Sequence, residues 1–234
     1  MNSITRKYTK TTKMSELIEA DYRMLLLLSR LGISLGFGEM SIQAICKKYD
    51  IDADCFLFMA NLQTNRSVYD YRAEFEKIGL DSVLLYLQKS HSYFIDRRLP
   101  HFRNALQNAI SNLETNVQKI ILRFFDDYSN EVNEHMQYEN DTAFPYIFSL
   151  LGVEVGKDYN ITVFEDHHSD IEGKMAELSR ILTKYIQGDA TSLTMTNVLI
   201  ELHIIQEELD SHTFIEEELV IPRVKKIEGG KAKR

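Results

Sequence analysis

Residues 135–145 read HMQYENDTAFP, and residues 212–222 read HTFIEEELVIP. Each stretch begins with His-x-x-x-Glu and has a proline ten residues after the histidine. One His-x-x-x-Glu is weak evidence, because i,i+4 pairs of this kind are common on exposed helix faces. Two copies with the same trailing proline are far less expected by chance, so the chain contains an internal repeat.

A further histidine precedes each copy of the repeat at the same distance. His91 lies 44 residues before His135, and His168 lies 44 residues before His212. His167 would lie 45 residues before His212, so the repeat prefers His168 and leaves His167 as its competitor. Two histidines fall outside the repeat and are interpreted as structural, namely His101 and His203.

The chain has few helix breakers, with three prolines and ten glycines in 234 residues. No convincing alternating strand pattern occurs, so we predict an all-α protein. Loop signals fall at 111–116, 152–160 and 188–192, and the first and third contain the midpoints of the two histidine pairs. If the chain reverses there, each pair lies about 33 Å from its turn on neighbouring antiparallel helices. This arrangement is an up-down four-helix bundle.

The sequence divides into four predicted regions. Residues 1–65 are predicted to form a small N-terminal domain of three short helices, capped by Ser15, Ser41 and Asp52. The first of these helices is expected to run to Leu31. The remaining regions are a linker at 66–78, the bundle at 79–222 and a disordered basic tail at 223–234.

The charge distribution limits the possible partners. The formal net charge is −8, and the basic ends leave residues 14–222 with a charge of −17. A body this acidic repels nucleic acid. No apolar run is long enough to cross a membrane or to form a signal peptide, so we predict no membrane contact. Two cysteines, Cys46 and Cys55, do not make a disulfide framework, and a cytoplasmic location is expected.

A helix-turn-helix interpretation of residues 41–62 is the alternative without metal chemistry. Residues 1–65 carry eight basic and seven acidic residues, and the second helix of this candidate contains Phe56, Phe58 and Met59 but no lysine or arginine. This composition is poorly suited to reading the major groove.

The residues of the repeat are suited to binding metal. The i,i+4 spacing places His135 and Glu139 on one helix face, and it does the same for His212 and Glu216. Four histidines and two glutamates are too many for one tetrahedral zinc, but they suit two metals that share two bridging carboxylates. Such a site leaves positions open for dioxygen, nitric oxide or an oxo bridge. No nucleophile or acid–base pair is needed, so we predict no catalytic residue and no conventional enzyme.

These motifs resemble the hemerythrin-like (HHE cation-binding) family, most closely its di-iron proteins that repair iron centres. The resemblance covers nearly the whole chain and includes the stretch Asp-His-His-Ser-Asp at 166–170. It implies a cofactor of two iron ions in an oxo-bridged di-iron centre, with Glu139 and Glu216 as bridges. The histidines that it implies as iron ligands are His91, His135, His168 and His212.

The N-terminal segment resembles the small helical domain that precedes the bundle in this subgroup. The match runs through Leu31-Gly32-Ile33 and on to residues 41–50. The family commonly has adjacent cysteines in the turn after this Gly-Ile, whereas residues 34–38 here read SLGFG. The resemblance therefore does not extend to thiol chemistry in that turn.

Two functions follow from the resemblance. The first is repair of iron–sulfur or other iron centres damaged by nitrosative or oxidative stress, with nitric oxide or dioxygen as the gas ligand and iron–sulfur proteins as clients. The second is a sensor or carrier of dioxygen or nitric oxide that signals through the N-terminal domain. A nitric-oxide-reducing or iron-donating activity and a homodimer remain open.

Overall fold

The computed structural model describes residues 7–65, 69–152, 160–166, 171–186 and 193–231. Their regular secondary structure is helical apart from one isolated antiparallel bridge between Lys13 and Ser41, so the predicted all-α class is confirmed. The chain forms two compact units, residues 1–90 and 91–234. The division lies within a helix and not in the segment 66–78, which itself contains the short helix α5 (Tyr71–Phe75).

The first unit begins with four short helices, α1 (Met14–Ala20), α2 (Met24–Arg30), α3 (Ile42–Lys48) and α4 (Ala53–Asn65). The Ser41 hydroxyl accepts a hydrogen bond from the backbone N–H of Ala44, and the Asp52 carboxylate accepts one from that of Cys55. These two predicted helix caps are confirmed. Phe56, Phe58 and Met59 of α4 are buried in the unit's core, as the composition argument against a DNA-reading helix requires.

The predicted helix from Ser15 to Leu31 is wrong, because the chain leaves the helical conformation at Asp21. The Asp21 carboxylate accepts hydrogen bonds from both the backbone N–H and the guanidinium of Arg23. This local bonding competes with helix continuation and separates α1 from α2. Ser15 is also not the cap, because α1 starts at Met14 and Lys13 precedes it without a side-chain cap.

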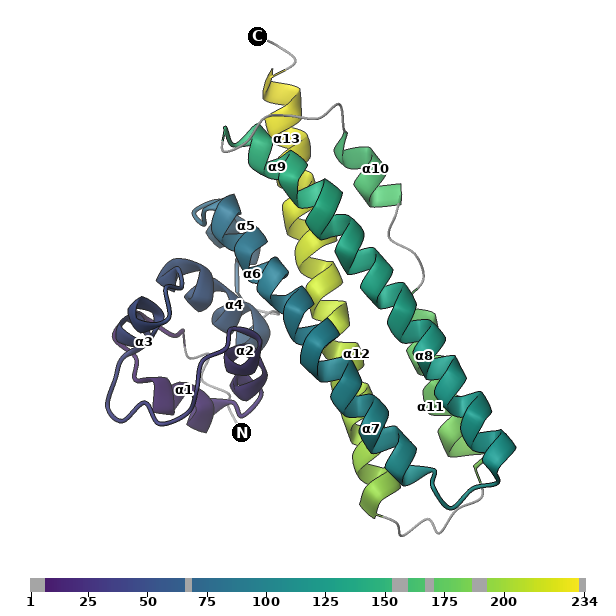
Figure 1. The fold of residues 1–234 in the computed structure, drawn as a ribbon. Coiled ribbons are helices and arrows are strands. Elements are labelled where there is room, and N and C mark those ends of the chain that lie inside the picture. The colour runs from purple at the N-terminus through teal and green to yellow at the C-terminus, as the bar shows by residue number, and fades with distance from the viewer. Residues whose placement is uncertain (1–6, 66–68, 153–159, 167–170, 187–192, 232–234) are drawn as a thin grey trace. The chain divides into compact units, whose positions relative to one another are not determined.

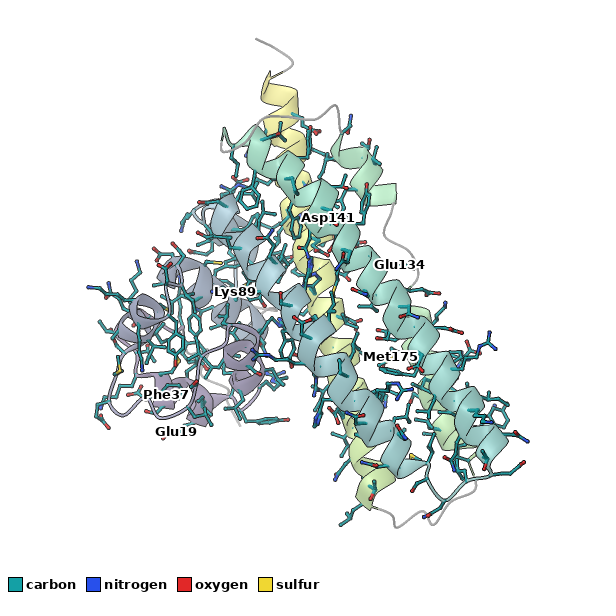
Figure 2. The ribbon with its side chains drawn as sticks, viewed as in Figure 1. Glu19, Phe37, Lys89, Glu134, Asp141 and Met175 are labelled. Atoms are coloured by element: carbon teal, nitrogen blue, oxygen red, sulfur yellow. The ribbon has the colours of Figure 1, made fainter. Side chains whose placement is uncertain are left out.

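The second unit contains a ring of four helices. α7 (Leu99–Ala109) packs against α8 (Thr115–Tyr138) and α12 (Leu193–Ile215), and α11 (Ile171–Lys184) packs against the same two helices. Figure 1 shows these helices running side by side along the bundle. Apolar side chains fill the ring, and they include Phe102, Phe125, Leu178, Leu202 and Met175, the last of which is labelled in Figure 2.

Three long helical stretches each contain a π-helical turn. α6 (Leu80–Tyr93) continues through η1 (Phe94–Arg98) into α7, and α8 continues through η2 (Glu139–Ala143) into α9 (Phe144–Leu150). α12 continues through η3 (Glu216–Val220) into α13 (Ile221–Lys231). π turns inside α-helices occur frequently at functional sites.

Each of the three prolines of the chain follows one of these π turns. The residue just before each proline donates its backbone N–H to the carbonyl five residues earlier, as Phe144 does to Glu139 before Pro145. Proline has no N–H, and its ring clashes with the carbonyl four residues earlier in a regular helix. The wider turn accommodates the ring, so the helix continues past the proline. Two of these prolines, Pro145 and Pro222, belong to the internal repeat of the sequence, and the third, Pro100, lies outside it.

Residues 223–231 belong to α13 and do not form the predicted disordered tail. Glu228 of this helix accepts hydrogen bonds from the Tyr146 hydroxyl and from the backbone N–H of Ile161, the first residue of α10 (Ile161–Asp166). α13 packs against both α9 and α10. A run of charges that looked solvated in the sequence therefore lies on a helix with a packed face.

Candidate metal centre

Four of the six predicted ligands converge in the second unit. His91, Glu139, His212 and Glu216 each place one donor atom within 4.8 Å of the others. His91 comes from the end of α6, Glu139 and Glu216 open the π turns η2 and η3, and His212 lies one turn before Glu216 on α12. Residues far apart in the sequence therefore meet at one height of the bundle. Glu139 lies between Glu134 of α8 and Asp141 of η2, which are both labelled in Figure 2 and mark the height of the site along this helix.

Glu139 lies between two histidines. Its Oε1 atom is 2.9 Å from Nε2 of His135, and its Oε2 atom is 3.0 Å from Nε2 of His91. His135 is thus the fifth predicted ligand at the site, and its side chain is 13% exposed, whereas that of Glu139 is fully buried. A carboxylate whose two oxygens lie beside different imidazoles offers a nitrogen–oxygen donor pair on each side.

His212 and Glu216 form a second pair. Nε2 of His212 is 3.0 Å from Oε1 of Glu216, as the i,i+4 spacing predicts. Nε2 of His212 also lies 3.0 Å from Nε2 of His91. The two copies of the repeat therefore place their donor atoms against one another in the interior of the bundle.

Aromatic rings enclose this cluster. Phe144 stacks on the His91 ring with centroids 5.4 Å apart, and Phe94 meets the His212 ring edge-on at 6.2 Å. Both phenylalanines are fully buried. Their rings exclude water, which strengthens every electrostatic interaction within the cluster.

The burial of charged groups shifts two pKa values. Burial and the charge of Glu216 raise the pKa of Glu139, but the nearby His135 and His91 lower it more, so it lies below its ordinary value. Burial lowers the pKa of His91, but the close contact with the Glu139 carboxylate and its negative charge raise it more, so it lies above its ordinary value. The carboxylate is therefore held in its anionic form, which is the form that binds metal.

The unpaired atoms of the cluster fit a cation. Neither oxygen of Glu139 accepts a well-directed hydrogen bond from any residue that the structure describes, although each lies about 3 Å from an imidazole nitrogen. Lone pairs that face one another across such distances repel unless a proton or a cation lies between them. Imidazole nitrogen with carboxylate oxygen is a donor set that suits iron, zinc or manganese, and two buried carboxylates offset the charge of a divalent ion.

His168 and its competitor His167 lie outside the described residues. The structure places the other two histidines away from the cluster. The side chain of His101 is 73% exposed and lies 3.7 Å from Glu201, and His203 is exposed on α12. Their assignment outside the site agrees with this geometry.

Asn140 lies at the site but was not predicted from the sequence. Its side-chain oxygen lies 2.9 Å from Nδ1 of His91, on the side of the ring opposite the cluster. The two residues are 49 positions apart, and no spacing rule connects them. The only local signal was the position of Asn140 directly after Glu139.

A helical bundle with buried histidine and glutamate donors defines a metal-binding protein class. The chain matches the Hemerythrin HHE cation binding domain over residues 87–224, which is more than half of its length. The chain therefore belongs to the hemerythrin HHE cation-binding family. Comparisons with curated proteins and with solved structures give no significant match. Across the described residues, no helix has the length and apolar character needed to cross a membrane.

Proposed function

We propose that the chain is a non-haem di-iron protein that acts in the repair of iron centres damaged by nitrosative or oxidative stress. The observation that carries the proposal is the setting of Glu139. Its oxygens each lie beside a different histidine, so one carboxylate offers a donor pair to each of two cations. The repeat supplies the matching pair His212 and Glu216, with His168 as the sixth ligand.

The protein's residues would hold the ions and shield them. Histidine-rich ligation stabilises the ferrous form, and the two glutamates offset the charge of the pair. Bound iron supplies a redox-active centre with open positions for a diatomic gas. The rings of Phe94 and Phe144 restrict the access of water to the cluster, which favours an apolar gas over water as the incoming ligand.

The first test is metal content per chain together with the visible spectrum, before and after dithionite and nitric oxide. We expect about two irons per chain, with bands that bleach on reduction and change with nitric oxide. Protein that stays free of metal after purification and after iron reconstitution would contradict the proposal.

Matched variants test whether the metal binds at the residues of the repeat. Glu139→Ala and His212→Ala should each lower the affinity for iron by at least about tenfold, because ligands and their partners dominate metal binding. The iron content of the purified variants should fall accordingly. His203→Ala is the control, since His203 lies on the same helix as His212 but is exposed. A Glu139→Ala or His212→Ala protein with full iron would remove that residue from the ligand set.

A second candidate function is a sensor or carrier of nitric oxide or dioxygen. The observation in its favour is the state of the two thiols, Cys46 and Cys55, which are both buried in the first unit. Burial raises the pKa of Cys46 to about 12, so no reactive thiol supports iron handover there. The two functions differ on exposure to nitric oxide. A sensor keeps its iron and releases the gas reversibly, whereas a repair protein loses iron to a chelator or an apo-protein client.

A further inference from the structure

Asn140 is the polar neighbour of the metal-facing histidine His91. It lies in the π turn η2, directly after Glu139, and is half-buried. Its Oδ1 atom lies 2.9 Å from Nδ1 of His91, whose ring is fully buried. An amide oxygen is only an acceptor, so the contact requires the proton of His91 to be on Nδ1. In the neutral ring this leaves the lone pair on Nε2, the atom that faces Glu139 and His212 and that can bind a cation.

We propose that Asn140 is a positioning residue for the metal centre, which fixes both the tautomer and the ring orientation of His91. The inference rests on the metal site of the proposed function and not on the repair role. Metal-binding histidines usually donate their second ring N–H to an oxygen, and such partners commonly change metal affinity by about 10–100-fold.

The π turn explains how two neighbouring residues serve one site. In a regular α-helix, consecutive side chains project about 100° apart, so a residue next to an inward-facing glutamate points elsewhere. A π turn spreads its residues over a wider ring, and the angle between neighbours is smaller. Glu139 therefore reaches the Nε2 side of His91 while Asn140 reaches its Nδ1 side.

In the second copy of the repeat, the structure shows no hydrogen bond from a described residue that would support the His212 ring as Asn140 supports that of His91. Nδ1 of His212 is buried and has no hydrogen-bond partner within the described part of the chain. The His212 ring is held by packing, with Phe94 edge-on to it and His91 beside it. The imidazoles of His91 and His212 are thus held by different means, and the loss of Asn140 should affect the cation bound through His91.

Two substitutions separate the hydrogen bond from packing. Asn140→Leu has nearly the same volume but no acceptor, whereas Asn140→Asp keeps the acceptor and adds charge. Asn133→Leu is the matched control, because Asn133 lies on α8 and its buried Oδ1 accepts no hydrogen bond from the described residues. Iron-loaded wild-type and variant proteins are mixed with an excess of a ferrous chelator, and the release of each iron equivalent is timed.

We expect Asn140→Leu to release one equivalent of iron about 10–100-fold faster, while Asn140→Asp and Asn133→Leu release it at the wild-type rate. We also expect a lower reduction potential for the bound iron in Asn140→Asp, because a carboxylate makes His91 a stronger electron donor. In the zinc-loaded protein, the His91 Nδ1–H proton resonance should be sharp in wild type and in Asn140→Asp and exchange-broadened in Asn140→Leu.

The outcomes discriminate between this inference and the proposed function. Wild-type protein that binds no metal would remove the proposed function itself. Wild-type protein that binds iron, with Asn140→Leu holding it equally well, would overturn the role of Asn140 alone. Equal losses in the Leu and Asp variants would also overturn it, because packing would then explain both. If Asn140→Leu does not fold, an unchanged reduction potential in Asn140→Asp would be the contrary result.

Discussion

Nε2 of His91 and Nε2 of His212 lie 3.0 Å apart, although the two residues are separated by 121 positions in the sequence. Two imidazole nitrogens at this distance cannot both present lone pairs to each other. A proton or a cation must lie between them. The contact is therefore the point at which metal binding and protonation compete in this protein.

The competition makes stability depend on pH in opposite ways with and without metal. In the metal-free protein the raised pKa of His91 contributes stability below its ordinary value of 6.5, which is lost as pH rises through the folded-state pKa. The lowered pKa of Glu139 contributes stability above its ordinary value of 4.5, which is lost as pH falls through the folded-state pKa. The pair contributes fully between these two ordinary values.

We therefore expect metal-free protein to lose thermal stability as pH rises from 6 to 8. Metal binding requires unprotonated histidine, so the rise in melting temperature caused by metal should be larger at pH 8 than at pH 6. Each tenfold gain in affinity adds about 1.4 kcal/mol, equivalent to about 3–6 °C for a chain of this size. Calorimetry at both pH values measures this difference. A metal-induced shift that is equal at the two values would contradict the competition.

The prediction that His168 is a metal ligand can be tested by two adjacent substitutions. The 44-residue spacing predicts that His168→Ala lowers metal affinity by at least about tenfold, as the loss of a ligand does elsewhere. His167→Ala is the control and should retain the metal content of wild type. Metal analysis after dialysis against a chelator reads out both variants. If His167→Ala is the variant that loses metal, the two residues exchange roles.

The two thiols should be inert in the folded protein. Burial raises the pKa of Cys46 to about 12, and burial also raises that of Cys55, with nearby acidic groups adding to the effect. Since the thiolate is the reactive form, alkylation of Cys46 at pH 8 should be about a thousandfold slower than that of a free cysteine. Mass spectrometry after iodoacetamide treatment, in buffer and in guanidinium, gives the comparison. Rapid labelling of the folded protein would show that the first unit opens readily.

The helix α13 should contribute to the stability of the second unit. Glu228→Ala leaves the Tyr146 hydroxyl and the Ile161 N–H without their acceptor, at a cost of about 1–3 kcal/mol. In a Tyr146→Phe background the same substitution should cost less, because one of the two donors is already absent. Glu134→Ala, at an exposed site on α8, should change stability by less than about 0.5 kcal/mol. Equal effects of Glu228→Ala and Glu134→Ala would show that the contacts of Glu228 in α13 contribute no stability.

Some features of the fold and site were readable from local patterns. The scarcity of prolines and glycines predicted a helical chain, and Ser41 and Asp52 were recognised as caps because a cap depends only on the next three residues. The break at Asp21 was missed, because the competing bond to Arg23 lies within a run that otherwise has helical periodicity. The helical end of the chain was missed because Glu228 is stabilised by α9 and α10, which are distant in the sequence.

By itself, the sequence determined which residue types could bind metal and at what height of the bundle they lie. The number of residues between two positions carries this information. In a helix, that number sets both their separation along the axis and whether they share a face. Only the tertiary structure decided that the prolines end π turns, that Asn140 reaches His91, and that Glu139 lies between two histidines. These relationships depend on the angular phase of one helix against another. A π turn changes that angular phase. Packing between helices, and not local helix propensity, decides which side chains then face one another.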